Sequence, residues 1–286
     1  GDVYKRQELN DCIKNDLDIE ILKRTPSSFL GTCRYKLPHY EKNSAVYEKL
    51  FAILKKLDIK HFFYIGGNDS MDTIKKLAEY ANKINSDITF MGVPKTIDND
   101  LDKTDHTPGY GSAAKYVASA MKEIILDTDT YTTDSITIVE IMGRNAGYIA
   151  LWCGIANGAE DILLPERYDN DEQALINHII EARKRGKKHH LIINAEGIGH
   201  STGMARRIEA ATGIETRATI LGYMQRGGSP TCKDRVYASV MGAYAVDLLC
   251  EGKSNRLVAY KDGKFVDFDI DEALACLLYT SDAADD

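Results

Sequence analysis

The stretch HFFYIGGNDS at residues 61–70 decides how we interpret the chain. Residues 61–65 form a short apolar and aromatic run, which predicts a β-strand, and residues 70–84 have helical periodicity. Two glycines, Gly66 and Gly67, lie between the two patterns. Glycine lets a backbone approach a phosphate closely, and a helix start presents free N–H groups. The stretch therefore predicts a phosphate-binding turn, or simply a tight turn from strand to helix.

The same order of strand and helix recurs along the rest of the chain. Further strands are predicted at 88–93, 135–141, 161–164 and 189–195. Further helices are predicted at 111–126, 145–157, 171–185 and 230–250. This alternation indicates parallel strands with crossover helices, so the predicted fold class is doubly wound α/β. Ligands of such sheets bind at the carboxyl ends of the strands.

Composition excludes several classes of protein. The 286 residues carry a formal net charge of −7, which does not favour nucleic-acid binding. No run approaches the roughly 18 apolar residues that a membrane span needs. The six cysteines lie far apart, without CxxC pairs or histidines at zinc-finger spacing, which predicts reduced thiols and a cytoplasmic protein.

The loop PKTIDND, residues 94–100, follows the strand at 88–93. Asp98 and Asp100 lie two residues apart, with Lys95 and Thr96 nearby. One carboxylate can accept a proton from an attacking hydroxyl, and the other can bind Mg²⁺ or orient the first. Lys95 can neutralise charge on a departing phosphate. The alternative is a polar loop with an Asx turn.

Three further segments carry candidate anion- or sugar-binding residues. Arg144 lies in EIMGRN at 140–145, again between a strand and a helix. It either binds a phosphate or a sugar, or is a surface arginine without a binding function. Glu196 follows the strand at 189–195 and can bind a sugar hydroxyl or cap a loop. Arg34 can reach a phosphate or form a surface salt bridge. In residues 215–230, helix capping explains Ser229 and Pro230 but not Arg217 and Arg226.

No Walker A motif and no GxSxG motif is present. The remaining candidates form an anion-binding α/β site equipped with carboxylates, and this combination suggests phosphoryl transfer.

The motifs PKTIDND, EIMGRNAGY and ETRATILGYMQRGGSP, in this order, resemble those of the phosphofructokinase family over roughly residues 29–271. The resemblance implies two doubly wound, Rossmann-like domains with mainly parallel sheets and the active site between them. The implied phosphoryl-donor domain comprises residues 8–110 and 225–262 and lacks the family's first strand. The implied fructose 6-phosphate domain comprises 111–224 and 263–275. Residues 1–7 and 276–286 are expected to be extraneous tails.

The resemblance also assigns roles. Asp98 is the implied base for the 1-hydroxyl of fructose 6-phosphate, and the implied catalytic set is Asp98, Asp69, Lys95 and Arg144. The implied substrate-binding set is Thr96, Asp98, Asp100, Met142, Gly143, Arg144, Glu196, Arg217, Tyr223 and Arg226. Within it, Tyr223 and Arg226 would hold the 6-phosphate. Arg217 would reach the site of a neighbouring subunit in a homo-oligomer, a dimer or a tetramer.

The donor site is implied to contain Gly67, Asn68, Asp69, Ser70, Lys95 and Arg34, with Mg²⁺ held by Asn68 and Asp100. ATP-using relatives typically have glycine at positions 69 and 95. Asp69 and Lys95 resemble pyrophosphate-dependent members instead, so pyrophosphate is the predicted donor. The alternatives are an ATP-dependent enzyme and a non-catalytic subunit that binds sugar phosphate. Two departures from the family pattern are Asn68, where many relatives have aspartate, and Ser135, where ATP-using relatives often have arginine.

Overall fold

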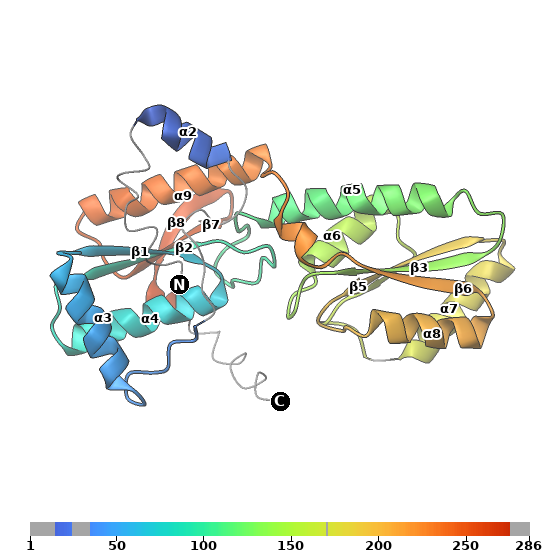
Figure 1. The fold of residues 1–286 in the computed structure, drawn as a ribbon, viewed down its shortest axis with the longest axis horizontal. Helices are drawn as coiled ribbons and strands as arrows, with labels where there is room; N and C mark the ends of the chain where they lie inside the picture. Colours follow the sequence, from blue (N-terminus) through green and yellow to red (C-terminus); the bar gives the residue numbers. More distant parts are fainter. Residues whose placement is uncertain (1–14, 25–34, 170, 275–286) are drawn as a thin grey trace. The chain divides into compact units, whose positions relative to one another are not determined.

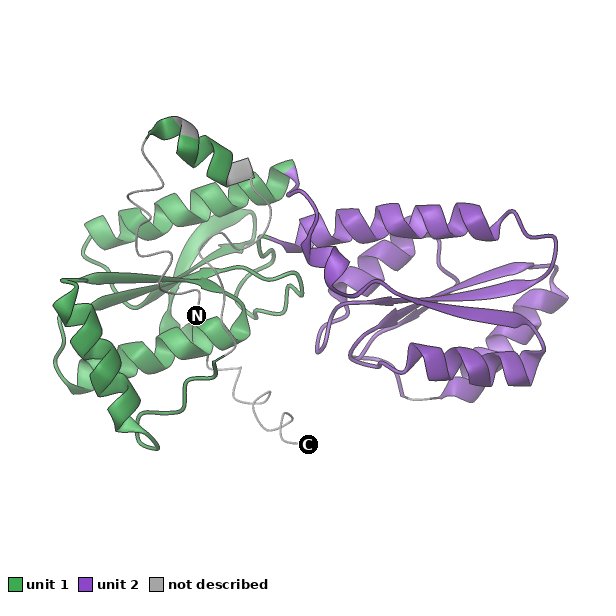
Figure 2. Cartoon of the chain, viewed as in Figure 1, with its two compact units in different colours: residues 1–108, 232–286 green, residues 109–231 purple. Residues whose placement is uncertain are grey.

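The computed structural model describes residues 15–24, 35–169 and 171–274. The chain divides into two compact units, the first made of residues 1–108 and 232–286 and the second of residues 109–231 (Figure 2). Each unit contains one four-stranded sheet. None of the helices in the described part of the chain has the length and apolar character that crossing a bilayer requires.

The sheet of unit 1 has the order β1-β2-β7-β8 (Figure 1). Strands β1 (His61–Gly66), β2 (Thr89–Pro94) and β7 (Arg256–Lys261) are parallel, and β8 (Lys264–Asp269) runs antiparallel to β7. Because β1 and β2 pair in register from His61 with Thr89 to Gly66 with Pro94, their carboxyl ends lie side by side.

Helices cover both faces of this sheet. Helices α3 (Ser44–Lys56) and α4 (Asn68–Lys83) lie on one face and α9 (Cys232–Cys250) on the other (Figure 1). Successive residues of β2 serve the two faces, since Phe90 packs in the cluster with α3 and α4 while Met91 packs with α9. Burial on both faces explains the continuous apolar run of β2. Two short helices, α2 (Asp16–Arg24) and α10 (Ile270–Ala273), complete the described part of this unit.

The sheet of unit 2 is entirely parallel, in the order β4-β5-β3-β6. Its strands are β4 (Asp161–Leu163), β5 (His189–Ala195), β3 (Ser135–Ile141) and β6 (Glu215–Ile220). Helices α5 (Tyr110–Thr128) and α6 (Tyr148–Asn157) cover one face, and α7 (Glu172–Lys184) and α8 (Ser201–Thr212) cover the other (Figure 1). The short 3₁₀ helix η2 (Gly222–Arg226) follows β6.

The predicted fold class is confirmed: the chain is α/β, with two mainly parallel sheets covered by helices. One predicted boundary differs, because residues 263–275 were expected in the second domain, whereas β8 pairs with β7 in unit 1. Asp262 and Gly263 both have positive φ and form a two-residue hairpin turn that joins the two strands. Residues 225–231 likewise lie in unit 2 rather than unit 1.

Candidate active site

The first cluster of predicted residues lies where β1 and β2 end. The backbone N–H of Lys95 donates to Gly66 O at 2.8 Å, which extends the pairing of the two strands into their loops. A Cβ atom on Gly67 would lie 3.5 Å from Thr96 Cβ, so the two loops are in contact. The structure therefore brings the predicted donor turn and the PKTIDND loop together within unit 1.

Helix α4 begins directly at this turn, with Asn68, Asp69 and Ser70 in its first turn. A Cβ atom on Gly66 would lie 2.0 Å from Ser70 Oγ, so only glycine fits where the strand enters the helix. The first N–H groups of a helix have no partner within it and carry positive partial charge. This end of α4 is therefore suited to an anion.

Asn68 and Asp100 join the two loops through their side chains. Asn68 Nδ2 donates to Asp100 Oδ2 at 2.5 Å. The other oxygens of the pair, Asn68 Oδ1 and Asp100 Oδ1, are buried and have no hydrogen-bond partner. Burial raises the pKa of the Asp100 carboxyl, and the negative charge of Asp69 raises it further. The charged form of Asp100 is therefore disfavoured where it stands, mainly because the carboxyl group is buried.

These features fit a magnesium ion. Mg²⁺ prefers oxygen ligands and keeps several of its waters, so it needs only one or two protein groups. The buried oxygens of Asn68 and Asp100 are ligands of this kind, and a bound cation would favour the ionised form of Asp100 that burial and the charge of Asp69 disfavour. The predicted pair of magnesium ligands thus fits the geometry.

The residue between the two aspartates was not among the predicted site residues, yet it fixes their loop. Asn99 has a left-handed backbone, with φ of 53°, and a buried side chain. Its Oδ1 accepts from Thr107 N at 2.8 Å and from Thr107 Oγ1 at 3.1 Å, and its Nδ2 donates to Asp105 O at 3.2 Å. Thr107 Oγ1 also lies 2.9 Å from Thr96 O, so its one proton is shared between this carbonyl and Asn99 Oδ1. Asn99 therefore ties the loop to residues further along the chain.

Asp98 and Lys95 are the remaining predicted residues of this cluster. The backbone N–H of Asp98 donates to Thr96 Oγ1 at 3.2 Å, so Thr96 shapes the turn that presents the carboxylate. Asp98 is half-buried and Lys95 is exposed. Both are placed on the loop that also carries Asp100.

The second cluster lies in unit 2, where β3 and β5 end. Glu196 N donates to Ile141 O at 2.8 Å, and Gly197 N donates to Gly143 O at 3.2 Å. A Cβ atom on Gly197 would lie 1.9 Å from Arg144 O, so the two loops touch backbone to backbone. The predicted sugar-binding residues Gly143, Arg144 and Glu196 are thereby collected at one edge of the sheet.

Gln225 links the end of β3 to η2 and was not predicted from the sequence. Its buried Oε1 accepts from Met142 N at 3.2 Å, and its Nε2 donates to Gly222 O at 3.0 Å. Through this side chain Met142 lies against the segment that carries Tyr223 and Arg226. The guanidinium carbon of Arg226 lies 5.2 Å from the centroid of the Tyr223 ring, a cation–π contact, and both side chains are exposed.

Arg217 is not brought to this edge within its own chain. It pairs in register with Thr137, in the middle of β3, whereas the edge lies beyond Ile141. Its guanidinium contacts Glu215 Oε1 at 2.6 Å and Tyr131 Oη at 3.4 Å. Its implied reach to a neighbouring subunit stays a prediction. Arg34 lies outside the described residues.

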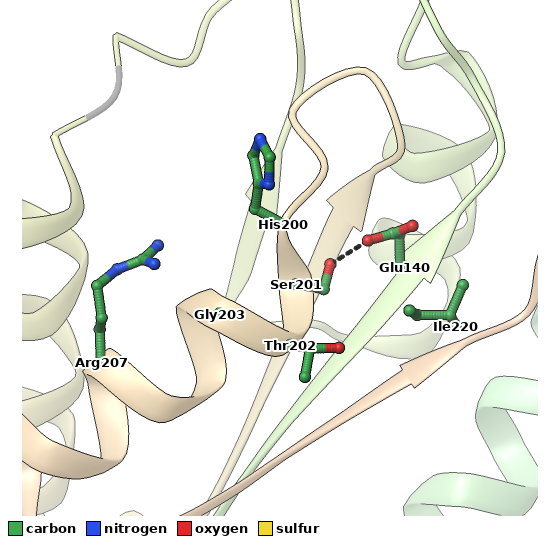
Figure 3. A pocket seen from close by; sticks show the side chains of 7 residues that line it. All are labelled: Glu140, His200, Ser201, Thr202, Gly203, Arg207 and Ile220. Atoms are coloured by element: carbon green, nitrogen blue, oxygen red, sulfur yellow. Dashed lines mark hydrogen bonds between the residues drawn. The ribbon is translucent and has the colours of Figure 1, made fainter.

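A hollow of about 610 Å³ lies at the start of α8, where Glu140 accepts a hydrogen bond of 2.5 Å from Ser201 Oγ (Figure 3). Its other lining residues are His200, Thr202, Gly203, Arg207 and Ile220. None of the predicted sugar-binding residues lines it. The predicted site is therefore an arrangement of loops at strand ends rather than this hollow.

Two mainly parallel sheets, a helix start suited to an anion and a loop with two aspartates define a doubly wound α/β phosphotransferase. The comparisons with known proteins agree with this class. The chain belongs to the phosphofructokinase family, whose family model matches residues 6–249.

Relatives of known description use two kinds of donor. The chain is 47% identical over 234 residues to the "ATP-dependent 6-phosphofructokinase 1" of Clostridium perfringens, covering 82% of this chain and 70% of the relative. It is 46% identical to an ATP-dependent 6-phosphofructokinase of Clostridium botulinum over 80% of this chain and 69% of the relative. Among solved structures, the pyrophosphate-dependent phosphofructokinase of Marinobacter aquaeolei superposes with a TM-score of 0.79 at 30% identity, covering 91% of this chain and 69% of that one.

Proposed function

We propose that the chain transfers a phosphoryl group to the 1-hydroxyl of fructose 6-phosphate, giving fructose 1,6-bisphosphate. The observation that carries this proposal is the position of Asp98. It lies on a loop that Asn99 holds in place, and this loop contacts the anion-ready start of α4. A carboxylate beside a phosphate-binding turn is the arrangement that deprotonation of an attacking hydroxyl needs.

The proposed reaction assigns a separate task to each residue of unit 1. Asp98 takes the proton of the 1-hydroxyl as its oxygen attacks the phosphorus and the bond to the leaving phosphate breaks. Thr96 and the start of α4 hold the transferring group, and Lys95 neutralises charge on the leaving phosphate. Asn68 and Asp100 would hold Mg²⁺, which would screen the negative charge of the donor phosphates.

The strand ends of unit 2 are proposed to bind the sugar. Met142, Gly143, Arg144 and Glu196 lie together, and Gln225 links them to the segment with Tyr223 and Arg226. A guanidinium held over an aromatic ring is a pre-ordered partner for the 6-phosphate. Arg217 is proposed to act on a neighbouring subunit, because it lies away from the residues of this edge.

The comparisons favour ATP as the donor. Relatives from two Clostridium species that are 46–47% identical are described as ATP-dependent, whereas the pyrophosphate-dependent protein from Marinobacter aquaeolei is 30% identical. On this ground ATP is the better supported donor, and the pyrophosphate prediction is unconfirmed.

Two side chains favour pyrophosphate, which is therefore the second candidate. Asp69 lies close enough to Asp100 for its charge to raise the pKa of that carboxyl. A negative side chain in the donor turn fills space and repels the further phosphate groups of a nucleotide, whereas compact pyrophosphate needs less room. Two like charges about 4 Å apart repel by about 4 kcal/mol at an effective dielectric constant near 20. Lys95 adds a cation for the departing phosphate.

A donor comparison tests the reaction and separates the two candidates. The protein is assayed with fructose 6-phosphate, Mg²⁺ and either ATP or pyrophosphate. Turnover with ATP alone supports the first candidate, and turnover with pyrophosphate alone supports the second. The double variant Asp69→Gly with Lys95→Gly should then change donor preference only if pyrophosphate is the natural donor.

Asp98→Asn tests whether the protein is a catalyst at all. The substitution keeps the shape and removes the base, so kcat should fall roughly 10²–10⁴-fold while binding of fructose 6-phosphate is retained. Asp102→Asn, an exposed aspartate of the same loop, is the matched control and should be silent. Absence of turnover with both donors, in a folded wild type that binds the sugar, would favour a non-catalytic subunit instead.

A further inference from the structure

Three potential metal ligands converge in unit 2, away from the proposed active-site edge. They are Asp161 at the start of β4, His178 in α7 and His190 near the start of β5. One ligand atom from each residue lies within 4.8 Å of those of the other two. Asp161 Oδ1 lies 2.9 Å from His178 Nδ1, and Asp161 Oδ2 lies 2.6 Å from His190 Nε2.

The strand register explains why these side chains meet. Asp161 pairs with Ile192, and His190 lies on the same face of β5 as Ile192 because side chains alternate along a strand. Ile192 packs in one cluster with Ile176 and Ile179 of α7, so this face looks toward that helix. His178 lies between these two isoleucines in the sequence. The three ligands are therefore fixed by the hydrophobic core beside them.

We propose that Asp161, His178 and His190 bind a divalent transition-metal ion of the zinc type. Two imidazoles and one carboxylate form a ligand set that zinc takes readily and that Mg²⁺ and Ca²⁺ do not prefer. The His190 side chain is only 4% exposed, while that of His178 is 45% exposed, so the cluster is anchored on one side and open to water on the other. A water can therefore complete a tetrahedral site.

The distances suit this ion after a small adjustment. Zinc lies about 2.0–2.2 Å from nitrogen and oxygen ligands, which places tetrahedral ligands roughly 3.3 Å apart. Both separations from Asp161, 2.9 Å to His178 Nδ1 and 2.6 Å to His190 Nε2, are shorter than this. They widen if the Asp161 carboxyl group rotates and the exposed His178 moves outward. The neighbouring carboxylate of Glu160 does not compete for the ion, because it contacts Lys187 Nζ and accepts from Leu191 N at 2.7 Å.

Hydrogen bonding keeps Asp161 ready to ligate. Burial acts to raise the pKa of this carboxyl, but the hydrogen bonds from His190 and His178 outweigh burial and hold its pKa below the ordinary value. The carboxylate is thus ionised at neutral pH. When a metal binds, the protons of these hydrogen bonds leave for solvent or for the other ring nitrogen, and the freed lone pairs of both imidazoles coordinate the ion. The ion would cross-link β4, β5 and α7.

The test uses the metal itself. The protein is stripped with EDTA and titrated with Zn²⁺ by calorimetry, and with Co²⁺ by its visible absorption, which reports tetrahedral coordination. Every cysteine except the buried Cys153 is replaced by serine throughout, because thiolates bind the same ions; these are Cys12, Cys33, Cys232, Cys250 and Cys276. We expect saturable binding near one ion per chain and a higher melting temperature with Zn²⁺.

Matched histidine variants assign the site. His178→Ala removes an exposed ligand without opening the core, and should weaken zinc binding at least ten-fold and abolish the thermal shift. His189→Ala is the control, since His189 lies on the opposite face of β5 and contacts Ser135 Oγ at 2.9 Å. Absence of saturable binding to the wild type, or equal binding by His178→Ala, overturns the proposal and leaves a hydrogen-bonded cluster without metal.

Discussion

Asn99 ties the PKTIDND loop to residues further along the chain. Its neighbours on both sides are the two aspartates, and its amide makes three hydrogen bonds that hold the turn. Asparagine is also one of the few residues other than glycine that adopt a left-handed backbone without large strain. A side chain that meets both demands can direct Asp98 and Asp100 without touching any substrate.

Asn99→Ala is therefore expected to lower both stability and turnover. The substitution leaves the buried N–H of Thr107 without an acceptor, which costs about 1–3 kcal/mol of unfolding free energy. Because the loop loses its anchor, kcat should fall more than KM for the sugar rises. Chemical denaturation and steady-state kinetics measure the two effects.

Asn85→Ala is the control for backbone strain. Asn85 has the same left-handed conformation, with φ of 50°, but its side chain is exposed. The variant should show the strain cost alone and normal kinetics. If Asn85→Ala and Asn99→Ala destabilise equally and neither changes kcat, Asn99 does not position the loop.

The raised pKa of Asp100 predicts that the stability of the metal-free protein depends on pH. The raised pKa means that the folded chain binds this proton more tightly than the unfolded chain, so stability is lost as pH rises through the ordinary value near 3.8 toward neutrality. Asp100→Asn should therefore raise the melting temperature of the metal-free protein at pH 7 and have less effect toward pH 4. A gain of 1 kcal/mol corresponds to roughly 2–4 °C for a chain of this size.

At pH 7, magnesium should reverse the order of the melting temperatures of the wild type and Asp100→Asn. In the proposed site Mg²⁺ would stabilise the wild type through Asp100, and the variant would lack that charged ligand, so addition of Mg²⁺ should raise the melting temperature of the wild type more. Melting curves of both proteins with and without Mg²⁺ provide the comparison. An equal magnesium shift in the two proteins would exclude Asp100 as a ligand.

At the scale of elements, the contact between the loops after β3 and β5 is possible only because residue 197 is a glycine, which has no side chain. A Cβ atom on Gly197 would lie 1.9 Å from the backbone oxygen of Arg144, and backbone cannot move aside as a flexible side chain can. Its conformation is not left-handed, so the demand for glycine is steric alone.

Gly197→Ala should push these loops apart. We expect a destabilisation of about 1–3 kcal/mol, as for other overpacked sites, and a larger KM for fructose 6-phosphate, because Arg144 and Glu196 separate. Gly242→Ala is the control: the added methyl meets nothing within 4 Å in α9, and alanine favours helix by about 0.5–1 kcal/mol. Sugar binding that is unchanged in Gly197→Ala would remove Glu196 from the proposed site.

Local periodicity was enough to predict β1, β2, β3 and β5, the strands at whose ends most of the candidate residues lie. The strand predicted at 135–141 coincides with β3 and that at 189–195 with β5, since both are buried apolar runs between turns. Helices α3 and α8 and the hairpin β7–β8 were not predicted. The Asp262–Gly263 dipeptide is the local sequence signal that indicates this hairpin.

Tertiary partners set the limit of prediction within the site. Asn99 lies within the PKTIDND motif, but its function depends on Thr107, and that of Gln225 depends on a backbone N–H more than 80 residues away. The cluster of Asp161, His178 and His190 comes from three separate elements, so spacing along the sequence could not reveal it. The candidate side chains at strand ends could be predicted from the sequence. The side chains that position them through contacts with distant parts of the chain could not.

At the scale of the whole molecule, unit 2 is a continuous insertion, residues 109–231, in the chain of unit 1. Its four strands are all its own, and the cluster around Ile138, Ile179 and Ile192 contains no residue of unit 1. Among the described residues, the clusters of unit 1 likewise draw only on that unit. Each unit therefore has the sheet and core that independent folding requires.

Residues 109–231 expressed alone should therefore fold. A segment of this size lies in the usual range of single domains, and removing it from unit 1 breaks no strand pairing. We expect one cooperative unfolding transition, coincident by far-UV circular dichroism and by the dispersed methyl signals of its NMR spectrum. A gradual transition with collapsed methyl signals would show that this core needs unit 1, and that the two sheets, although separate in pairing, are not separate in stability.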